Sequence, residues 1–242
     1  MSDMAHLDHE MPQLDARMLE IARYWDSLRG DRAVPGRVEI RPTEIARHLS
    51  RLAILARPRA GTVRLRLVGA HVMNRIGMEL RGMPFRALFD LDDRGTAMAA
   101  AEAAISTPAV TVLALSSGEG PHAALEGHMM ILPLCDTTGA LTRAMALYSE
   151  VPNWKAAPYE EPGRLRVTGT WVLDIPEVGP LLPAGQSDAP NLRRISQRAA
   201  RDLAIAVAPD ADIDAPAMPL QAPKVGAPTA APILRLIEGG RS

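Results

Sequence analysis

Cysteine and aromatic residues are scarce in this chain of 242 residues. Cys135 is its one cysteine, and aromatic residues make up only 3% of the sequence. A single cysteine excludes a disulfide within the chain and a zinc site built from several cysteines, and it is typical of a reducing compartment. Hydrophobic residues still make up 47%, so the core must consist mainly of aliphatic side chains and Met. Met suits adaptable apolar surfaces and also serves as ordinary core filler.

The chain also lacks long apolar runs and an excess of positive charge. No stretch approaches the ~18 uninterrupted apolar residues of a membrane-spanning helix. Residues 1–11 lack the charged-then-apolar pattern of a secretion signal. We therefore expect a cytoplasmic protein without a membrane span. The formal net charge of -1 gives no support for nucleic-acid binding, so no nucleic-acid partner is predicted.

Motifs of common enzyme classes are missing as well. Neither the nucleophile motif Gly-x-Ser-x-Gly nor the phosphate-binding motif Gly-x-x-x-x-Gly-Lys occurs. No histidine stands at helical metal-ligand spacing from the single cysteine. Cys135 has no His or Arg beside it in the sequence to lower the pKa of its thiol. We therefore predict no catalytic site, no metal and no cofactor.

The first predicted element is an amphipathic helix over residues 12–30, after a terminus, residues 1–11, that we expect to be disordered. Apolar residues recur there at three- and four-residue spacing, which predicts one apolar stripe. The stripe has two interpretations, packing on its own domain or contact with a second copy. Met18 and Trp25 are its candidate partner-contact residues. The stripe consists of Leu14, Met18, Ile21, Ala22, Trp25 and Leu28.

Residues 31–175 are predicted to form one α+β domain. Two alternating runs on either side of a turn signal predict a hairpin, and short helices broken by glycines follow over residues 70–106. Three further strands complete a five-stranded antiparallel sheet with short helices on one face. Residues 165–174 either add a strand or dock as an extended segment. The five strands are expected at residues 52–56, 62–70, 109–115, 125–134 and 143–151.

Residues 176–242 have a different composition, with ten prolines and no aromatic residue. Such a segment buries too little apolar surface to offset its conformational entropy, so we expect a mostly disordered tail. One amphipathic stripe with arginines around it predicts a short helix near residues 191–207. Arg194 and Arg198 on this helix are candidate partner contacts.

Several short phrases occur in a recognisable order: YWDSLRG at 24–30, PTEI at 42–45, RLRLVG at 64–69 and GMELRGMPF at 77–85. Over about residues 20–152 the series resembles the alphaproteobacterial PAS-domain family that includes MopJ-like motility and cell-cycle regulators. The resemblance implies a PAS-like fold and a regulatory, non-catalytic, cytoplasmic protein that forms a homodimer and binds protein partners.

The resemblance also places any ligand between the sheet and the short helices. The cysteine motif of flavin-binding PAS domains is missing. No His lies on the helix expected at residues 92–106, where haem-binding PAS sensors resemble one another, so both cofactors are disfavoured. Apolar pockets with a few polar groups are the usual design for small ligands, although the same residues also fit a closed core. The candidates for such a pocket are His71, Met73, Asn74, Ile76, Phe85, Phe89, Met98, Leu113, Met129 and Met145.

Three functions are left open by the sequence. We prefer a signalling module that acts through protein contacts and is gated by a small apolar ligand. The second is a pure interaction or localisation adaptor with an empty core. The third is a small α+β enzyme whose site the motifs do not reveal.

Overall fold

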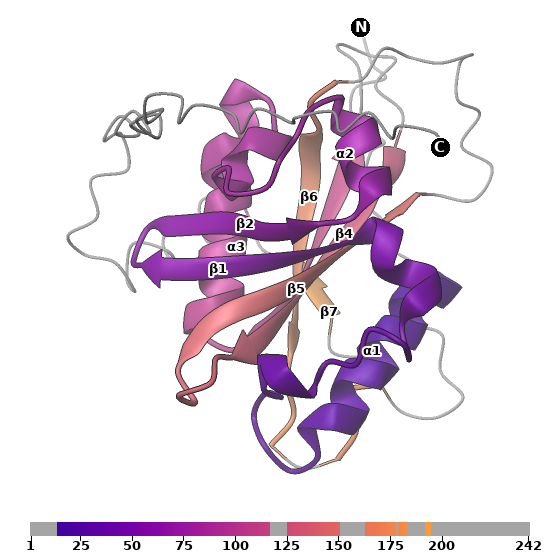
Figure 1. The fold of residues 1–242 in the computed structure, drawn as a ribbon, viewed down its shortest axis with the longest axis vertical. Helices are drawn as coiled ribbons and strands as arrows, with labels where there is room; N and C mark the ends of the chain where they lie inside the picture. Colours follow the sequence, from indigo (N-terminus) through magenta and orange to yellow (C-terminus); the bar gives the residue numbers. More distant parts are fainter. Residues whose placement is uncertain (1–13, 117–124, 151–162, 178, 183–191, 195–242) are drawn as a thin grey trace, which may run out of the picture. The chain divides into compact units, whose positions relative to one another are not determined.

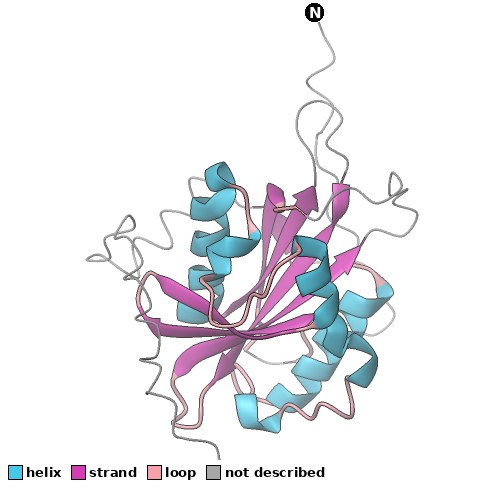
Figure 2. Cartoon of the chain, turned by 45° about the horizontal axis from the view of Figure 1, so that its top comes forward, coloured by secondary structure: helices cyan, strands magenta, loops and turns pink. Residues whose placement is uncertain are grey.

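An antiparallel sheet with helices on both faces forms the described part of the chain (Figures 1 and 2). The structure is a computed structural model, and it describes residues 14–116, 125–150, 163–177, 179–182 and 192–194. The predicted α+β class with a PAS-like sheet is confirmed. The short helices predicted within residues 70–106 pack on one face of the sheet, and the N-terminal helix covers the second face.

Each end of the N-terminal helix carries a residue that suits its capping position. Oδ1 of Asp15 accepts a hydrogen bond of 2.8 Å from the amide of Met18, which is the usual role of Asp as an N-cap. Gly30 follows the helix with φ of 57°, a conformation that glycine adopts without steric cost. The helices are α1 (Ala16–Arg29), α2 (Ala70–Ile76) and α3 (Arg94–Ser106), and the 3-10 segments are η1 (Arg37–Glu39), η2 (Ala46–Arg51), η3 (Phe85–Leu88) and η4 (Leu91–Asp93).

The sheet has the strand order β2-β1-β5-β4-β3-β6-β7, and all neighbouring strands are antiparallel. The first five strands are the predicted ones, and β6 extends the sheet beside β3, so the segment at residues 165–174 adds a strand. The strands are β1 (Leu52–Arg59), β2 (Thr62–Val68), β3 (Ala109–Ser116), β4 (Leu125–Cys135), β5 (Leu141–Glu150), β6 (Arg166–Asp174) and β7 (Leu192–Arg194).

Strand β7 overlaps the helix predicted near residues 191–207. Leu192–Arg194 pairs with Trp171–Leu173 of β6, so this part of the helix prediction is wrong. An edge strand such as β6 presents unpaired backbone groups, and pairing with β7 satisfies them, which a local helical periodicity does not anticipate. The remainder of the predicted helix and the predicted disordered terminus at residues 1–11 lie outside the described residues.

Alternation along the strands divides the apolar side chains between two cores. One core lies between the sheet and the helices α2 and α3, and includes Leu55, Leu113 and Ile131. The other lies between the sheet and α1. The apolar stripe of α1 fills this second core, where Met18, Ile21 and Trp25 are fully buried. Of the two interpretations of the stripe, packing on its own domain is therefore the one observed.

The chain stays in the second core beyond residue 175, so the domain boundary predicted there is wrong. The guanidinium of Arg29 is buried, pairs with Asp26, and donates hydrogen bonds to the carbonyls of Pro176 and Gly179 at 3.2 and 2.8 Å. Oδ2 of Asp26 in turn accepts from the amide of Leu181 at 2.9 Å. These polar contacts hold the segment against the domain, although its composition does not predict that it packs there. The apolar residues that the segment adds to the core are Leu181 and Leu182.

Candidate functional site

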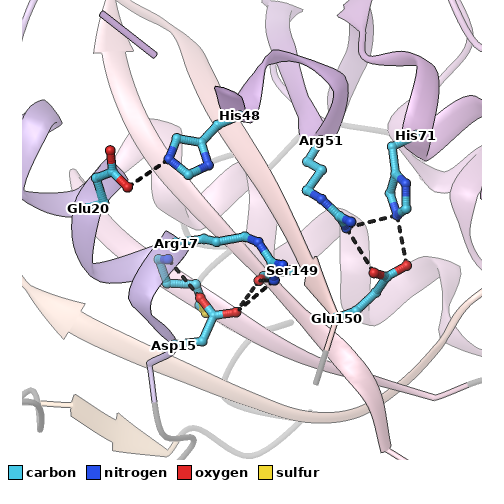
Figure 3. A network of polar contacts seen from close by, with 9 residues as sticks. Asp15, Arg17, Glu20, His48, Arg51, His71, Ser149 and Glu150 are labelled. Atoms are coloured by element: carbon cyan, nitrogen blue, oxygen red, sulfur yellow. Dashed lines mark hydrogen bonds and ion pairs between the residues drawn. The ribbon is translucent and has the colours of Figure 1, made fainter. Parts of the chain in front are cut away.

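Polar side chains from four elements meet at the C-terminal end of β5 (Figure 3). Successive side chains of a strand point to opposite faces of the sheet. Ser149 accordingly faces α1, while Glu150 faces η2 and α2. The last two residues of β5 therefore reach the elements that cover both faces of the sheet.

The first cluster joins Glu150 to Arg51, the last residue of η2, and to His71 in the first turn of α2. Nη1 of Arg51 donates to Oε2 of Glu150 at 3.0 Å, and Nε2 of His71 lies 2.8 Å from Oε1. The His71 ring also stacks on Tyr148, with ring centroids 6.0 Å apart. All three polar side chains are partly exposed, between 18% and 33%. Solvent therefore reaches a contact that links η2, α2 and β5.

One ring nitrogen of this cluster faces two incompatible partners. Nε2 of His71 lies 2.8 Å from Nη1 of Arg51 and 2.8 Å from Oε1 of Glu150. Arginine only donates and an ionised carboxylate only accepts, whereas a ring nitrogen can donate or accept but not both. Whether Nε2 carries a proton therefore decides which of the two neighbours His71 binds.

Glu150 is ionised at neutral pH in this setting. Partial burial alone would raise the pKa of its carboxyl, but the hydrogen bond and charge of His71, followed by those of Arg51, hold the pKa below its ordinary value. The cluster thus contains a carboxylate that keeps its negative charge, with Arg51 at one of its oxygens and His71 at the other.

The second cluster joins Ser149 to the first turn of α1. The hydroxyl of Ser149 donates a short hydrogen bond to Oδ2 of Asp15, whose other oxygen caps α1. Nη1 of Arg17 lies 3.5 Å from the Ser149 hydroxyl and 3.6 Å from Asp15. The N-terminus of α1 is therefore tied to the same strand end as the Arg51–His71–Glu150 cluster.

His128 lies beside the second cluster, because it is paired with Ser149 across β4 and β5. Its side chain is buried. Burial lowers the pKa of His128, although the charge of Asp15 acts in the opposite direction. His128 is therefore held neutral at neutral pH.

A further contact ties α1 to η2 (Figure 3). Nε2 of the buried His48 lies 3.0 Å from Oε2 of Glu20, an ion-pair distance without hydrogen-bond geometry. Arg47 donates to the other oxygen of Glu20. The hydrogen bond from Arg47, together with His48, holds the pKa of Glu20 below its ordinary value despite partial desolvation. The covering elements α1 and η2 are thus joined to each other as well as to β5.

Most of the predicted pocket residues share the core beneath α2 and α3. Met73 and Met98 are partly buried and pack against this core. Phe85 and Phe89 pack edge to face, with ring centroids 5.2 Å apart. The fully or nearly fully buried members are Ile76, Phe85, Phe89, Leu113 and Met129.

Three of the predicted pocket residues lie elsewhere. Met145 is buried in the opposite core against α1, because its neighbours Ala144 and Ala146 take the inward positions on the α3 side. Asn74 is exposed on the outer side of α2. His71 lies in the cluster at the end of β5. Met145 and Asn74 are therefore corrected as pocket residues.

The residues predicted to contact a partner also lie elsewhere than expected. Met18 and Trp25 have no exposed surface, and Nε1 of Trp25 donates to the carbonyl of Pro133 at 2.8 Å. They serve the core of their own domain and are not available to a partner. Arg194 lies in β7, paired with Trp171, and Arg198 lies outside the described residues.

The sequence interpretation named His71 but missed the residues around it. Arg51 is separated from His71 by 20 positions and Glu150 by 79. Contacts between polar side chains over such separations leave no periodic signal. The role of Asp15 could have been predicted from the sequence, because an acidic residue before an apolar stripe is a usual N-cap signal.

No helix in the described part of the chain is long and apolar enough to cross a membrane. No three His, Cys, Asp or Glu side chains of that part come together as metal ligands would. Burial, and then the neighbouring Asp136, raise the pKa of the Cys135 thiol, which keeps that thiol protonated at neutral pH.

A family model for the PAS domain matches residues 15–149, more than half of the chain. The chain belongs to the PAS domain family. The match begins at Asp15 and ends at Ser149, so this PAS domain includes α1 and ends at the strand end described above. Family membership suggests a signal-sensing or regulatory role. No curated protein matches the chain.

Proposed function

We propose that this PAS protein is a non-catalytic cytoplasmic regulator that acts through protein contacts and is gated by a small apolar ligand. Its resemblance to MopJ-like proteins supports a role in motility or cell-cycle control and a homodimeric state. A homodimer needs a surface other than the apolar stripe of α1, since Met18 and Trp25 are fully buried. Light scattering after size exclusion measures this state directly.

The double attachment of the β5 end is the observation that carries the proposal. Glu150 contacts η2 and also α2, which borders the predicted ligand core, and the adjacent Ser149 contacts the cap of α1. A displacement of α2 that moves Glu150 must also act on Ser149, because the two residues share one peptide bond. Coupling between the ligand core and α1 requires an element whose position is influenced from both sides. The end of β5 is such an element, because it contacts α2 through Glu150 and the cap of α1 through Ser149.

The ligand part of the proposal is supported by the core beneath α2 and α3. Its lining is apolar and includes Met73 and Met98, whose flexible side chains adapt to a guest. The edge-to-face packing of Phe85 on Phe89 favours the alternative, an adaptor whose core needs no ligand. Native mass spectrometry of the purified protein, followed by solvent extraction, separates the two. A bound apolar molecule whose removal lowers the melting temperature supports gating, and ligand-free protein with an unchanged melting temperature supports the adaptor.

Hydrogen exchange tests the coupling itself. Glu150→Gln removes the charge that holds Arg51 and His71, and Glu44→Gln is the matched control, since Glu44 pairs with Arg41 at the surface. We expect faster exchange of the Met18 amide, the donor to the Asp15 cap, in Glu150→Gln and not in the control. Unchanged exchange at Met18, with the melting temperature retained, would contradict the proposed coupling.

A further inference from the structure

Positive charge is concentrated in one stretch of a chain that is nearly neutral overall. Residues 51–89 contain eight arginines and no lysine, and Glu79 is the single acidic residue among them. The whole protein has a net charge of -1. A local excess of this size creates a positive potential that the overall charge conceals.

Three of these arginines are occupied within the domain. Arg51 pairs with Glu150, and Arg57 pairs with the buried Glu102. Arg75 donates to the carbonyl of Gly163 at 3.1 Å. The other five have no carboxylate of the described residues within ion-pair distance. They are Arg59, Arg64, Arg66, Arg81 and Arg86, here called the arginine edge.

The arginine edge follows one border of the sheet. Strand β2, which carries Arg64 and Arg66, is the edge strand beside β1 (Figure 1). The segment around Gly82 lies alongside it, since the amide of Gly82 donates to the carbonyl of Leu65 at 2.7 Å. Nη1 of Arg64 also donates to the carbonyl of Gly82 at 3.1 Å. The two segments that carry most of the arginine edge are thus neighbours in space.

Two large apolar side chains are exposed in the same stretch. Leu67, next to Arg66 on β2, is 44% exposed, and Met78, three positions before Arg81, is 37% exposed. Arginine and Met are enriched in protein interfaces, where apolar contacts accompany paired charges. The surface therefore combines guanidinium groups that have no carboxylate partner among the described residues with apolar contact area.

We propose that the arginine edge binds an acidic segment of a protein partner. The inference rests on the proposed function, because it names the surface and the chemistry of the partner through which the regulator acts. Guanidinium groups bind carboxylates through two parallel hydrogen bonds, and unpaired arginines beside an edge strand offer several such contacts. Leu67 and Met78 take apolar side chains that alternate with the acidic ones.

Nucleic acid fits this surface less well. Non-specific binding of single strands combines positive charge with aromatic side chains on which the bases stack. The aromatic residues of the stretch are Phe85 and Phe89, and both are fully buried. The arginine edge offers no platform for stacking, whereas its exposed Leu and Met match a polypeptide.

Fluorescence anisotropy with the full chain tests the proposal. The probe is a short labelled peptide with Asp at every second position and Leu or Ser between, and the control peptide has Asn in place of Asp. The test variant is Arg66→Glu combined with Arg81→Glu. The control variant is Arg23→Glu, an exposed arginine of α1. We expect binding of the Asp peptide that weakens with salt, is about tenfold weaker in the test variant, and is unchanged in the control.

Four outcomes would overturn the proposal. The Asn peptide binds as well as the Asp peptide, the test variant retains affinity, Arg23→Glu loses as much affinity, or a single-stranded oligonucleotide displaces the peptide at lower concentration. If the test variant keeps its affinity for the peptide but scatters more light, the arginines instead protect the sheet edge against self-association. Peptide binding can fail while the Glu150→Gln exchange effect holds, so the two proposals fail separately.

Discussion

The side chains of Asp15 and Ser149 are hydrogen bonded although 134 positions separate them in the chain. One carboxylate oxygen of Asp15 accepts from Ser149 and the other caps α1 through Met18. A single side chain thus fixes both the start of the helix and its attachment to the end of β5. The hydrogen bond joins the first and last residues of the PAS match.

Replacing Ser149 by alanine tests this attachment. We expect a loss of about 1.5–3 kcal/mol in the free energy of unfolding, since the mutation removes one hydrogen bond to a charged acceptor. Asp15→Ala loses the cap as well, about 1 kcal/mol more. Urea denaturation measures both. Ser27→Ala is the matched control, because the exposed Ser27 hydroxyl bonds only to the carbonyl of Tyr24 in its own helix, and a loss as large as in Ser149→Ala would refute the assignment.

Acidification tests the burial of His128. Burial lowers the pKa of this residue below 6.5 in the folded protein, so the unfolded chain binds the proton more readily. The free energy of unfolding is therefore unaffected by this group above about pH 6.5. As the pH falls below that value, the free energy of unfolding decreases by up to about 1.4 kcal/mol per pH unit. Urea denaturation between about pH 8 and about pH 5 measures the slope. His128→Asn should flatten the slope, and an identical slope in the variant would show that another group is responsible.

Alternation and turn signals predicted the five PAS strands because their side chains repeat with period two. Apolar residues at three- and four-residue spacing predicted α1 but not what its stripe packs against. An apolar stripe requires a partner surface, and one sequence does not say whether that surface belongs to the same chain. Met145 was misplaced for a related reason: strand register decides its face, and its apolar neighbours fit either core.

The candidate site was harder to predict than the fold. His71 was named, but its contacts come from η2 and β5, at distant positions in the sequence. The docked segment at residues 179–182 was missed because Arg29 and Asp26 hold its backbone. Prolines and low aromatic content indicate weak burial, and they carry no information about hydrogen bonds supplied by another helix.

Removing the buried guanidinium of Arg29 should release that segment. Arg29→Ala removes the guanidinium that pairs with Asp26 and donates to three backbone carbonyls, those of Arg32, Pro176 and Gly179. We expect a loss of about 3–5 kcal/mol in the free energy of unfolding. Amide exchange at Leu181, which donates to Asp26, should become faster as well. Arg23→Ala, at an exposed position of the same helix, should change stability by less than about 0.5 kcal/mol. Equal effects of the two variants would contradict the role of Arg29.

The buried pair of Arg57 and Glu102 gives a prediction about charge inside the ligand-side core. Glu102 is 2% exposed on α3 and pairs with Arg57 of β1. Its Oε2 has no hydrogen-bond partner in the part of the chain that the structure describes. Arg57→Leu leaves this carboxylate buried without its partner, which should cost about 3 kcal/mol.

The double variant Arg57→Leu with Glu102→Leu should recover most of that loss, because two apolar side chains of similar volume need no partner. Chemical denaturation of the four proteins in this cycle gives the coupling energy between the two sites. The corresponding cycle at the exposed pair of Arg41 and Glu44 serves as the control, with a coupling of about 0.5 kcal/mol or less. Additive losses at Arg57 and Glu102 would mean that the pair is not buried as a unit, and that the carboxylate beside the apolar core is solvated.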